Sequence, residues 1–124
     1  MKLYPDDVLR IAEQQGRQPP CQACAPLACA GWDSFPGTRS DAGLMRVGGL
    51  WAPGEDEPTL EEHHPAGTHQ WSPQAPIALA YHPANRCEVW QCRACGHPFL
   101  RYTEYGGYYE DACIRDLNPD LLVV

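Results

Sequence analysis

Two Cys-x-x-Cys pairs, separated by more than half of the chain, strongly restrict how this protein can fold. Cys92 and Cys95 lie between two predicted strands and are followed by Gly96, which lets the backbone turn beneath a bound ion. Cys21 and Cys24 form the other pair. Four thiolates are the ligand set that a closed structural zinc site prefers, and iron would accept the same four. The pattern therefore predicts that both pairs meet around one metal ion, with Zn²⁺ as the default and iron left open.

The stretch 90–99 resembles the second metal-binding turn, or knuckle, of zinc-ribbon and rubredoxin-like proteins, in which Cys-x-x-Cys-Gly lies between strands and an aromatic residue follows. The resemblance implies Cys92 and Cys95 as metal ligands, whereas Cys21 and Cys24 match it only as a Cys-x-x-Cys pair. It implies metal binding and no particular activity. Residues 90–110 also resemble stretches of small bacterial proteins, again without an implied activity.

Three further residues are candidate substitute ligands: Cys87, Cys29 and His97. Cys87 precedes Cys92 by five positions, and an ideal strand points side chains at that spacing to opposite faces. His97 follows Cys95 too closely to share an ion without strain. An isolated cysteine such as Cys29 is ordinarily a small buried apolar residue, and this is the competing interpretation for each cysteine outside the two pairs.

Proline and glycine are frequent, with 13 and 11 residues among 124, and this composition favours turns and loops over a helical bundle. We predict an α+β fold in a single domain. Its predicted parts are a short N-terminal helix within 1–16, an irregular Pro/Gly-rich middle at 17–75 with an acidic loop at 52–74, an antiparallel β-meander of three to four strands with a zinc-ribbon-like knuckle at 76–117, and a tail at 118–124.

The helix is predicted over Asp6–Gln15, because Pro5 suits its entry and Gly16 can end it. A strand over 44–51 is predicted to be interrupted at Gly48 and Gly49. Further strands are predicted over 77–82, 86–91, 99–105 and 108–117.

The last two strands flank Gly106-Gly107, which is a strong signal for a two-residue hairpin with Tyr105 opposite Tyr108. In that register one face carries Phe99, Arg101 and Thr103 together with Glu110, Ala112 and Ile114. Neither face is purely apolar, so the pattern does not assign the core side.

The formal net charge is −7, from 16 acidic and nine basic residues, and no basic patch is visible, so a nucleic-acid partner is disfavoured. No window approaches the roughly 18 apolar residues of a membrane span. The first ten residues carry acids where a secretion signal needs an apolar stretch. We expect a cytoplasmic protein without a membrane partner, in which cysteines serve metal binding rather than disulfides.

Aromatic residues gather near the predicted meander and form a candidate interaction surface: Trp90, Tyr102, Tyr105, Tyr108 and Tyr109. Tyrosine and tryptophan on a rigid sheet are good contact anchors. They also stack on bases, but residues 86–117 carry no excess of positive charge to hold a nucleic acid. Aromatic pairs that simply stabilise the hairpin are the alternative interpretation.

The sequence therefore favours a small zinc-binding, non-catalytic accessory or adaptor protein with a protein partner, and it leaves the partner and the oligomeric state open. A thiol redox or iron electron-transfer protein is one alternative, and a zinc-ribbon nucleic-acid binder is another. An enzyme is not favoured. The acidic loop with His63, His64 and His69 matches no HExxH pattern, and we interpret it as a stretch of charged residues exposed to solvent.

Overall fold

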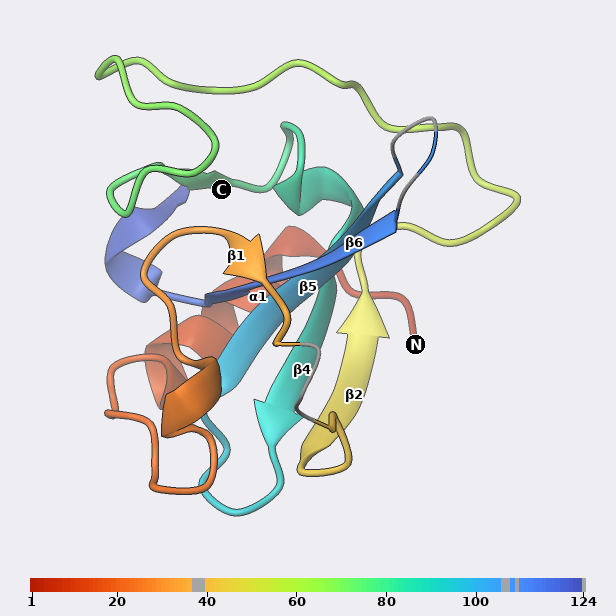
Figure 1. Ribbon diagram of the computed structural model, residues 1–124. Helices are drawn as coiled ribbons and strands as arrows, with labels where there is room; N and C mark the ends of the chain where they lie inside the picture. The colour runs from red at the N-terminus through yellow and green to blue at the C-terminus, as the bar shows by residue number, and fades with distance from the viewer. Residues whose placement is uncertain (37–39, 106–107, 109, 124) are drawn as a thin grey trace.

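The computed structural model describes residues 1–36, 40–105, 108 and 110–123 (Figure 1). Its elements in chain order are α1 (Pro5–Gln15), η1 (Ala25–Leu27), β1 (Asp33–Ser34), β2 (Leu44–Gly49), β3 (Ile77–Ala78), η2 (Ala84–Arg86), β4 (Glu88–Cys92), β5 (Pro98–Tyr105), β6 (Glu110–Asp116), η3 (Pro119–Leu121) and β7 (Leu122–Val123).

Within these described residues, one short N-terminal helix accompanies a five-stranded sheet in the order β1-β6-β5-β4-β2. Each neighbouring pair in this sheet is antiparallel, and β4, β5 and β6 follow one another as a meander. The strands β3 and β7 form a separate parallel pair. The α+β arrangement agrees with the prediction. No helix in the described part of the chain is long and apolar enough to cross a membrane.

The N-terminal helix α1 begins one residue before its predicted start and ends where predicted. The carboxylate of Asp7 accepts a hydrogen bond from the backbone N–H of Tyr4 at 2.9 Å, which satisfies one of the free donors at the helix start. Gly16 closes the other end by donating its N–H to the carbonyl of Ala12 at 2.8 Å. Val8 and Ala12 are fully buried and pack against one face of the sheet, as the helical spacing predicts.

The predicted register of the last hairpin is wrong by two positions. Tyr105 lies opposite Glu110, not opposite Tyr108, which is exposed. The turn at Gly106-Gly107 falls outside the described residues. A glycine pair is compatible with hairpin loops of more than one length, so it does not fix the register. Because a shift of two residues keeps every side chain on its own face, the predicted division of the two faces is confirmed.

The predicted interruption of the 44–51 strand is also wrong. Gly48 and Gly49 continue β2 and pair with β4, and the irregularity in the pairing comes one residue earlier, at Val47. Glycine occurs at these two positions because the N-terminal residues pack directly against them, and Lys2 makes a parallel bridge to Gly49. A Cβ on Gly48 would lie 2.5 Å from the carbonyl oxygen of Met1. The two glycines therefore let the chain start pack closely against β2.

The predicted strand over 77–82 is shortened to β3, which pairs with β7 from the predicted tail. Ile77, Ala78 and Leu79 are all buried, so the apolar residues here do not alternate between a core face and a solvent face. The segment continues through a turn into η2. The pairing joins positions more than 40 residues apart, which the local pattern could not indicate.

Each face of the sheet carries its own hydrophobic core. On the face that we call the helix face, α1 and the β3 segment cover buried side chains such as Val89, Leu100 and Cys113. On the opposite face, which we call the cysteine face, the segment leading into η1 covers one end of the sheet. The buried residues of this second core are Cys24, Leu27, Leu44, Cys92, Phe99 and Ile114.

The other end of the cysteine face stays open as a groove lined by side chains that include Arg46, Trp51, Trp90, Arg101 and Tyr105. We call this the sheet groove. The acidic loop 52–74 runs along the same end of the molecule, away from the turn after β4 (Figure 1). Hydrogen bonds hold it there, including one from Asn85 Nδ2 to the carbonyl of Thr59 at 2.8 Å.

Candidate metal centre

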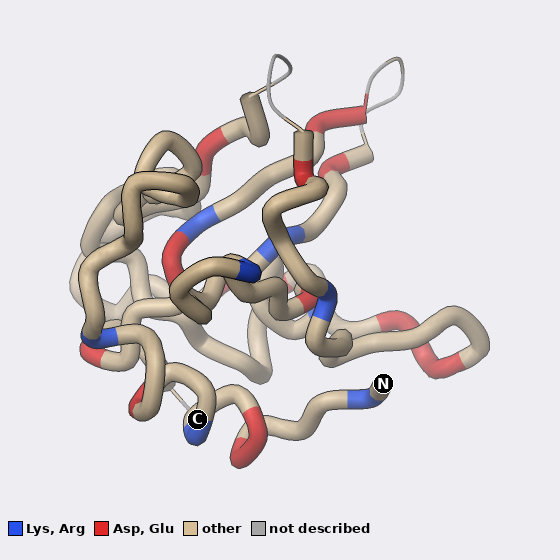
Figure 2. Tube along the Cα trace, turned by 90° about the horizontal axis from the view of Figure 1, so that it is seen from below, with Lys and Arg blue, Asp and Glu red and all other residues tan. Residues whose placement is uncertain are grey.

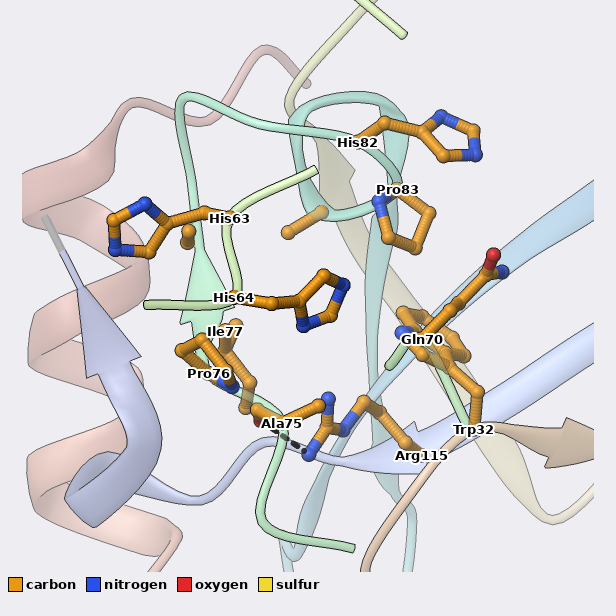
Figure 3. Close-up of a pocket in the computed structure, with 12 residues that line it drawn as sticks. Trp32, His63, His64, Gln70, Ala75, Pro76, Ile77, His82, Pro83 and Arg115 are labelled. Atoms are coloured by element: carbon orange, nitrogen blue, oxygen red, sulfur yellow. Dashed lines mark hydrogen bonds between the residues drawn. The ribbon is translucent and has the colours of Figure 1, made fainter. Parts of the chain in front are cut away.

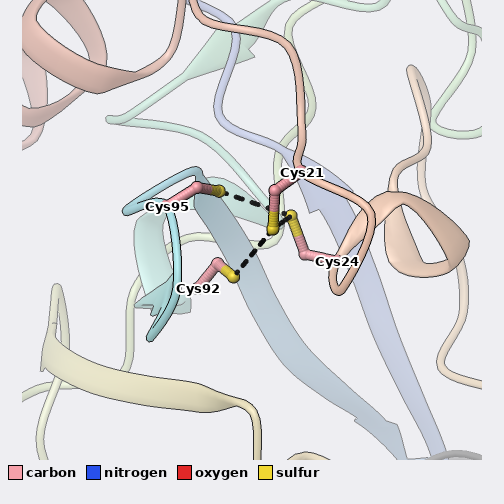
Figure 4. Close-up of side chains that lie close together, drawn as sticks. All are labelled: Cys21, Cys24, Cys92 and Cys95. Atoms are coloured by element: carbon pink, nitrogen blue, oxygen red, sulfur yellow. Dashed lines mark hydrogen bonds between the residues drawn. The ribbon is translucent and has the colours of Figure 1, made fainter.

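The four cysteines of the two pairs converge at the covered end of the cysteine face (Figure 4). Cys21 and Cys24 come from the segment between α1 and η1, whereas Cys92 ends β4 and Cys95 follows in the next turn. Their sulfur atoms all lie within 4.8 Å of one another. The predicted convergence of two distant pairs is therefore confirmed.

The spacing of the sulfur atoms matches a tetrahedral metal site. The Sγ–Sγ distances are 3.8 Å for Cys21 to Cys24, 3.7 Å for Cys21 to Cys92 and 3.6 Å for Cys24 to Cys95. A tetrahedron with Zn–S bonds of about 2.3 Å has edges of about 3.8 Å between sulfurs. A disulfide would need a distance of about 2.0 Å, and all seven cysteines are free. Three of the six sulfur pairs therefore have tetrahedral spacing, and the other three lie within 4.8 Å.

The turn after β4 is shaped by backbone hydrogen bonds that aim Cys92 and Cys95 at one point. The N–H of Cys92 donates to the carbonyl of His97 at 3.0 Å, and the N–H of Gly96 donates to the carbonyl of Cys92 at 2.8 Å. The N–H of His97 points at the sulfur of Cys95, 3.4 Å away. Gly96 has a φ of +81°, a conformation that costs other residues energy, so the glycine is required as predicted.

The other pair is built differently. The N–H groups of Cys24 and Ala25 both point at the carbonyl of Cys21, at 3.2 and 2.8 Å. The chain then continues into η1 with right-handed backbone angles, so no glycine is needed after Cys24. Leu27 on η1 is buried in the second core and anchors the segment against the sheet.

The four thiols differ in exposure and in acidity. Cys24 and Cys92 are buried, whereas Cys21 and Cys95 are partly exposed. Hydrogen bonding from the backbone of Cys24, helped by the neighbouring thiols, lowers the pKa of Cys21 to about 6. Burial raises the pKa of Cys24 above its ordinary value. A site of this kind has one thiolate ready near neutral pH, and a bound cation would favour loss of the remaining protons.

The three candidate substitute ligands lie outside the sulfur cluster. Cys87 is fully buried in the core on the helix face, opposite to Cys92, as strand geometry predicts. Its thiol donates to the carbonyl of Pro83 at 3.1 Å. The thiol of Cys29 likewise donates to a backbone carbonyl. Each of these thiols has a backbone partner of its own.

His97 is buried beside the centre and serves as a structural bridge. Its Nδ1 donates to the carbonyl of Gln18 at 3.0 Å, and its Nε2 lies 3.6 Å from a carboxylate oxygen of Asp116. Burial lowers the pKa of His97, but Asp116 and the Gln18 carbonyl outweigh burial and raise it above the ordinary value. The ring links the turn after β4 to the segment that precedes Cys21.

The aromatic residues of the predicted interaction surface are divided between different places. Trp90 and Tyr105 line the sheet groove. Tyr102 also borders this groove, but the residue is 7% exposed, and Gln70 donates a hydrogen bond to its hydroxyl. Tyr108 is exposed at the hairpin, and Tyr109 lies outside the described residues.

Among the residues that the structure describes, the four cysteines are the sole group of potential metal ligands with converging atoms. No protein-family model matches the chain, and comparisons with curated proteins and with solved structures give no match. The geometry of these four side chains is therefore the basis of the function proposed below.

Proposed function

We propose that the protein is a small, non-catalytic zinc protein in which one Zn²⁺ is held by Cys21, Cys24, Cys92 and Cys95. The observation that supports this most is the agreement between the sulfur spacing and a tetrahedral thiolate site. Four protein ligands leave no open position for substrate or water, which is typical of a structural site.

The proposed ion would attach the N-terminal cysteine segment to the sheet. Cys21 and Cys24 belong to a stretch with few regular hydrogen bonds, whereas Cys92 is fixed at the end of β4. Thiolate–zinc binding supplies on the order of 10 kcal/mol to folding, similar to the net stability of a whole domain. In a chain rich in loops, such a crosslink offsets the limited regular structure.

Metal content and ligand substitution test this proposal together. We expect one zinc per chain by elemental mass spectrometry, and loss of the metal in the Cys92→Ser variant. Cys113→Ser is the matched control, because Cys113 is equally buried but belongs to the core on the helix face. A wild-type protein without bound metal after zinc-supplemented expression, or a Cys92→Ser variant that keeps its zinc, would contradict the proposal.

We further propose that the sheet groove binds a protein partner, so that the protein acts as an accessory or adaptor. Trp90 and Tyr105 line this groove, and the guanidinium of Arg101 packs over the Trp90 ring at 4.7 Å. Aromatic residues and arginine are enriched among residues that dominate interface energies. Lysine and arginine residues of the described chain are interspersed with acids instead of forming a stripe, which supports a protein partner over a nucleic acid (Figure 2).

The adaptor proposal is tested with a partner that is first captured and identified, and then purified. We expect the Trp90→Ala substitution to weaken the reconstituted complex roughly tenfold or more. Trp71→Ala is the control, since Trp71 is also partly exposed but does not line the groove. Equal affinities for both variants would refute the groove as the contact, and steeply salt-dependent binding to oligonucleotides would favour the nucleic-acid alternative.

A thiol redox or iron electron-transfer protein remains the second candidate, because the lowered pKa of Cys21 is a property of reactive thiols. An iron site would colour the protein, and a dithiol site would be oxidised reversibly without a metal. A colourless protein with one zinc, whose cysteines resist mild oxidants until a chelator is added, would remove this candidate.

A further inference from the structure

Arg115 is a buried cation whose charge is not matched by a neighbouring acid. The residue is 1% exposed and lies in β6 on the helix face of the sheet. Its hydrogen bonds within the described residues both come from Nη2, to the carbonyls of Ala30 at 2.9 Å and Ala75 at 3.1 Å. The Nε atom is buried and has no partner there. Nη1 donates to no described residue either.

Ion pairs in the described part of the chain do not include Arg115. The adjacent Asp116 points to the other side of the strand, where its carboxylate accepts a hydrogen bond from the N–H of Cys29. A buried guanidinium without a counter-charge is expensive, and it ordinarily carries a carboxylate or another anion on its free N–H groups. Burial also lowers the pKa of Arg115, in line with an environment that disfavours the charge.

The guanidinium borders a small cavity between the sheet and the loops that cover it (Figure 3). Arg115 reaches into this space toward the imidazole of His64, with Ala75 on one side and Trp32 on the other. The Trp32 ring centroid is 5.9 Å from Cζ of Arg115. The cavity has room for roughly one water-sized group. Its size excludes a large ligand but suits a small ion.

His64 forms another polar part of the cavity wall, and both of its ring nitrogens already have partners. His64 uses Nε2 to contact Glu62 at 2.8 Å and Nδ1 to contact Thr68 at 2.9 Å. Neither nitrogen of the His64 ring is free to donate to a ligand. His82 also lines the cavity, and its buried Nδ1 has no partner among the described residues. The N–H groups of Arg115 are the permanently charged donors there, and they select for negative charge.

We propose that the cavity beside Arg115 binds a small monovalent anion, about the size of chloride, through the N–H groups of the guanidinium that have no acceptor among the described residues. The anion neutralises the buried cation, and Arg115 then connects the sheet to the Ala30 and Ala75 loops through Nη2. This site is separate from the four cysteines and does not depend on zinc binding.

The direct test is an NMR titration of the full-length protein with sodium formate and with sodium chloride, at constant ionic strength kept by sodium gluconate. The ¹⁵N–¹H resonance of Arg115 Nε is the probe. We expect it to shift and saturate with an affinity in the millimolar range, typical of a single charge-assisted contact. Saturation by chloride alone supports a site of the size of this cavity, whereas equal saturation by formate, which is larger than the cavity, contradicts it. A resonance that responds to neither salt overturns the proposal.

A second test compares the thermal unfolding of the wild-type protein with that of two matched variants. In the wild-type protein the melting temperature should rise by several degrees as the bound anion is added, because the ligand stabilises the folded state alone. Arg115→Met should abolish this rise. Arg101→Met should retain it, because Arg101 lies on the opposite face and pairs with Asp41. An equal rise in both variants refutes the site, and if Arg115→Met does not fold, the titration of the wild-type resonance decides.

Discussion

The seven cysteines fall into two groups according to what surrounds their sulfur atoms. Four sulfurs face one another within 4.8 Å. The other three thiols each point at a backbone carbonyl and belong to Cys29, Cys87 and Cys113. Burial raises the pKa of Cys29 and of Cys113 to about 11, and it raises the pKa of Cys87 as well. These three are therefore thiols that stay protonated, which is the ordinary behaviour of buried cysteine.

Acidity within the cluster predicts which cysteine reacts first when the metal is removed. In chelator-treated protein near neutral pH, iodoacetamide should label Cys21 first, because its pKa of about 6 makes it a thiolate. Cys24 should be labelled much more slowly, since burial raises its pKa. Mass spectrometry of peptides after timed labelling measures the order. Zinc should protect both residues, and equal labelling of Cys21 and Cys29 would contradict the expected difference.

Backbone conformation at the turn after β4 gives a second prediction at the residue scale. Gly96→Ala should weaken metal binding, because φ at this position is +81° and the turn would have to distort. Gly54→Ala is the matched control, with a φ of +98° but open space around it and no metal ligand beside it. Both substitutions should cost about 1–2 kcal/mol of stability. Only Gly96→Ala should lower zinc affinity in a competition with a chromogenic chelator.

At the scale of elements, β2 pairs with the N-terminal residues at one end and with β4, which ends at the candidate ligand Cys92, along its length. The first residues of the chain pack against the two glycines at the end of β2. The other end of β2 contributes Leu44 to the core around Cys92, its partner in the sheet register. This edge strand therefore joins the start of the chain to the candidate metal centre.

Substitutions of glycine in and near β2 test this arrangement. Gly48→Ala would place a Cβ 2.5 Å from the carbonyl oxygen of Met1, so the N-terminal bridge should open. We expect a loss of about 1–3 kcal/mol in the free energy of unfolding, as for overpacking elsewhere. Gly43→Ala, where no atom lies within 4 Å of the added Cβ, should be close to neutral. Urea denaturation of the two variants measures the difference, and similar midpoints would argue against the close packing.

At the scale of the whole molecule, the candidate metal centre lies where a loop-rich half of the chain meets the sheet. The N-terminal cysteine segment covers Phe99 and Ile114 through Cys24 and Leu27. These contacts are few, whereas the strands β4, β5 and β6 are held by continuous ladders. Loss of the metal should therefore release the segment before it disrupts the sheet.

Hydrogen exchange with and without a chelator checks this order. Amides over 21–30 should exchange much faster in the metal-free protein, while those of β5 stay protected for longer. Acidification of the metal-free protein should also lower its stability. Cys21 has a pKa of about 6 in the folded chain against 9.0 for a free thiol, so its contribution to stability is complete above pH 9 and is lost as the pH falls through 6. A metal-free protein with unchanged exchange over 21–30 would show that the segment docks without the ion.

The two cysteine pairs suggest a shared metal ion through the chemistry of four thiolates, although more than half of the chain separates them. Local patterns in the sequence suffice to predict the extent of α1 and the faces on which the residues of β5 and β6 lie. They suffice because capping, turn chemistry and strand alternation act between residues close together in the chain. Tertiary packing alone decides the hairpin register, the pairing of β3 with β7, and the separation of Cys29 from the sulfur cluster. It also decides the burial of Arg115 beside a cavity. These features depend on contacts between distant residues, whose energies no short stretch of sequence contains.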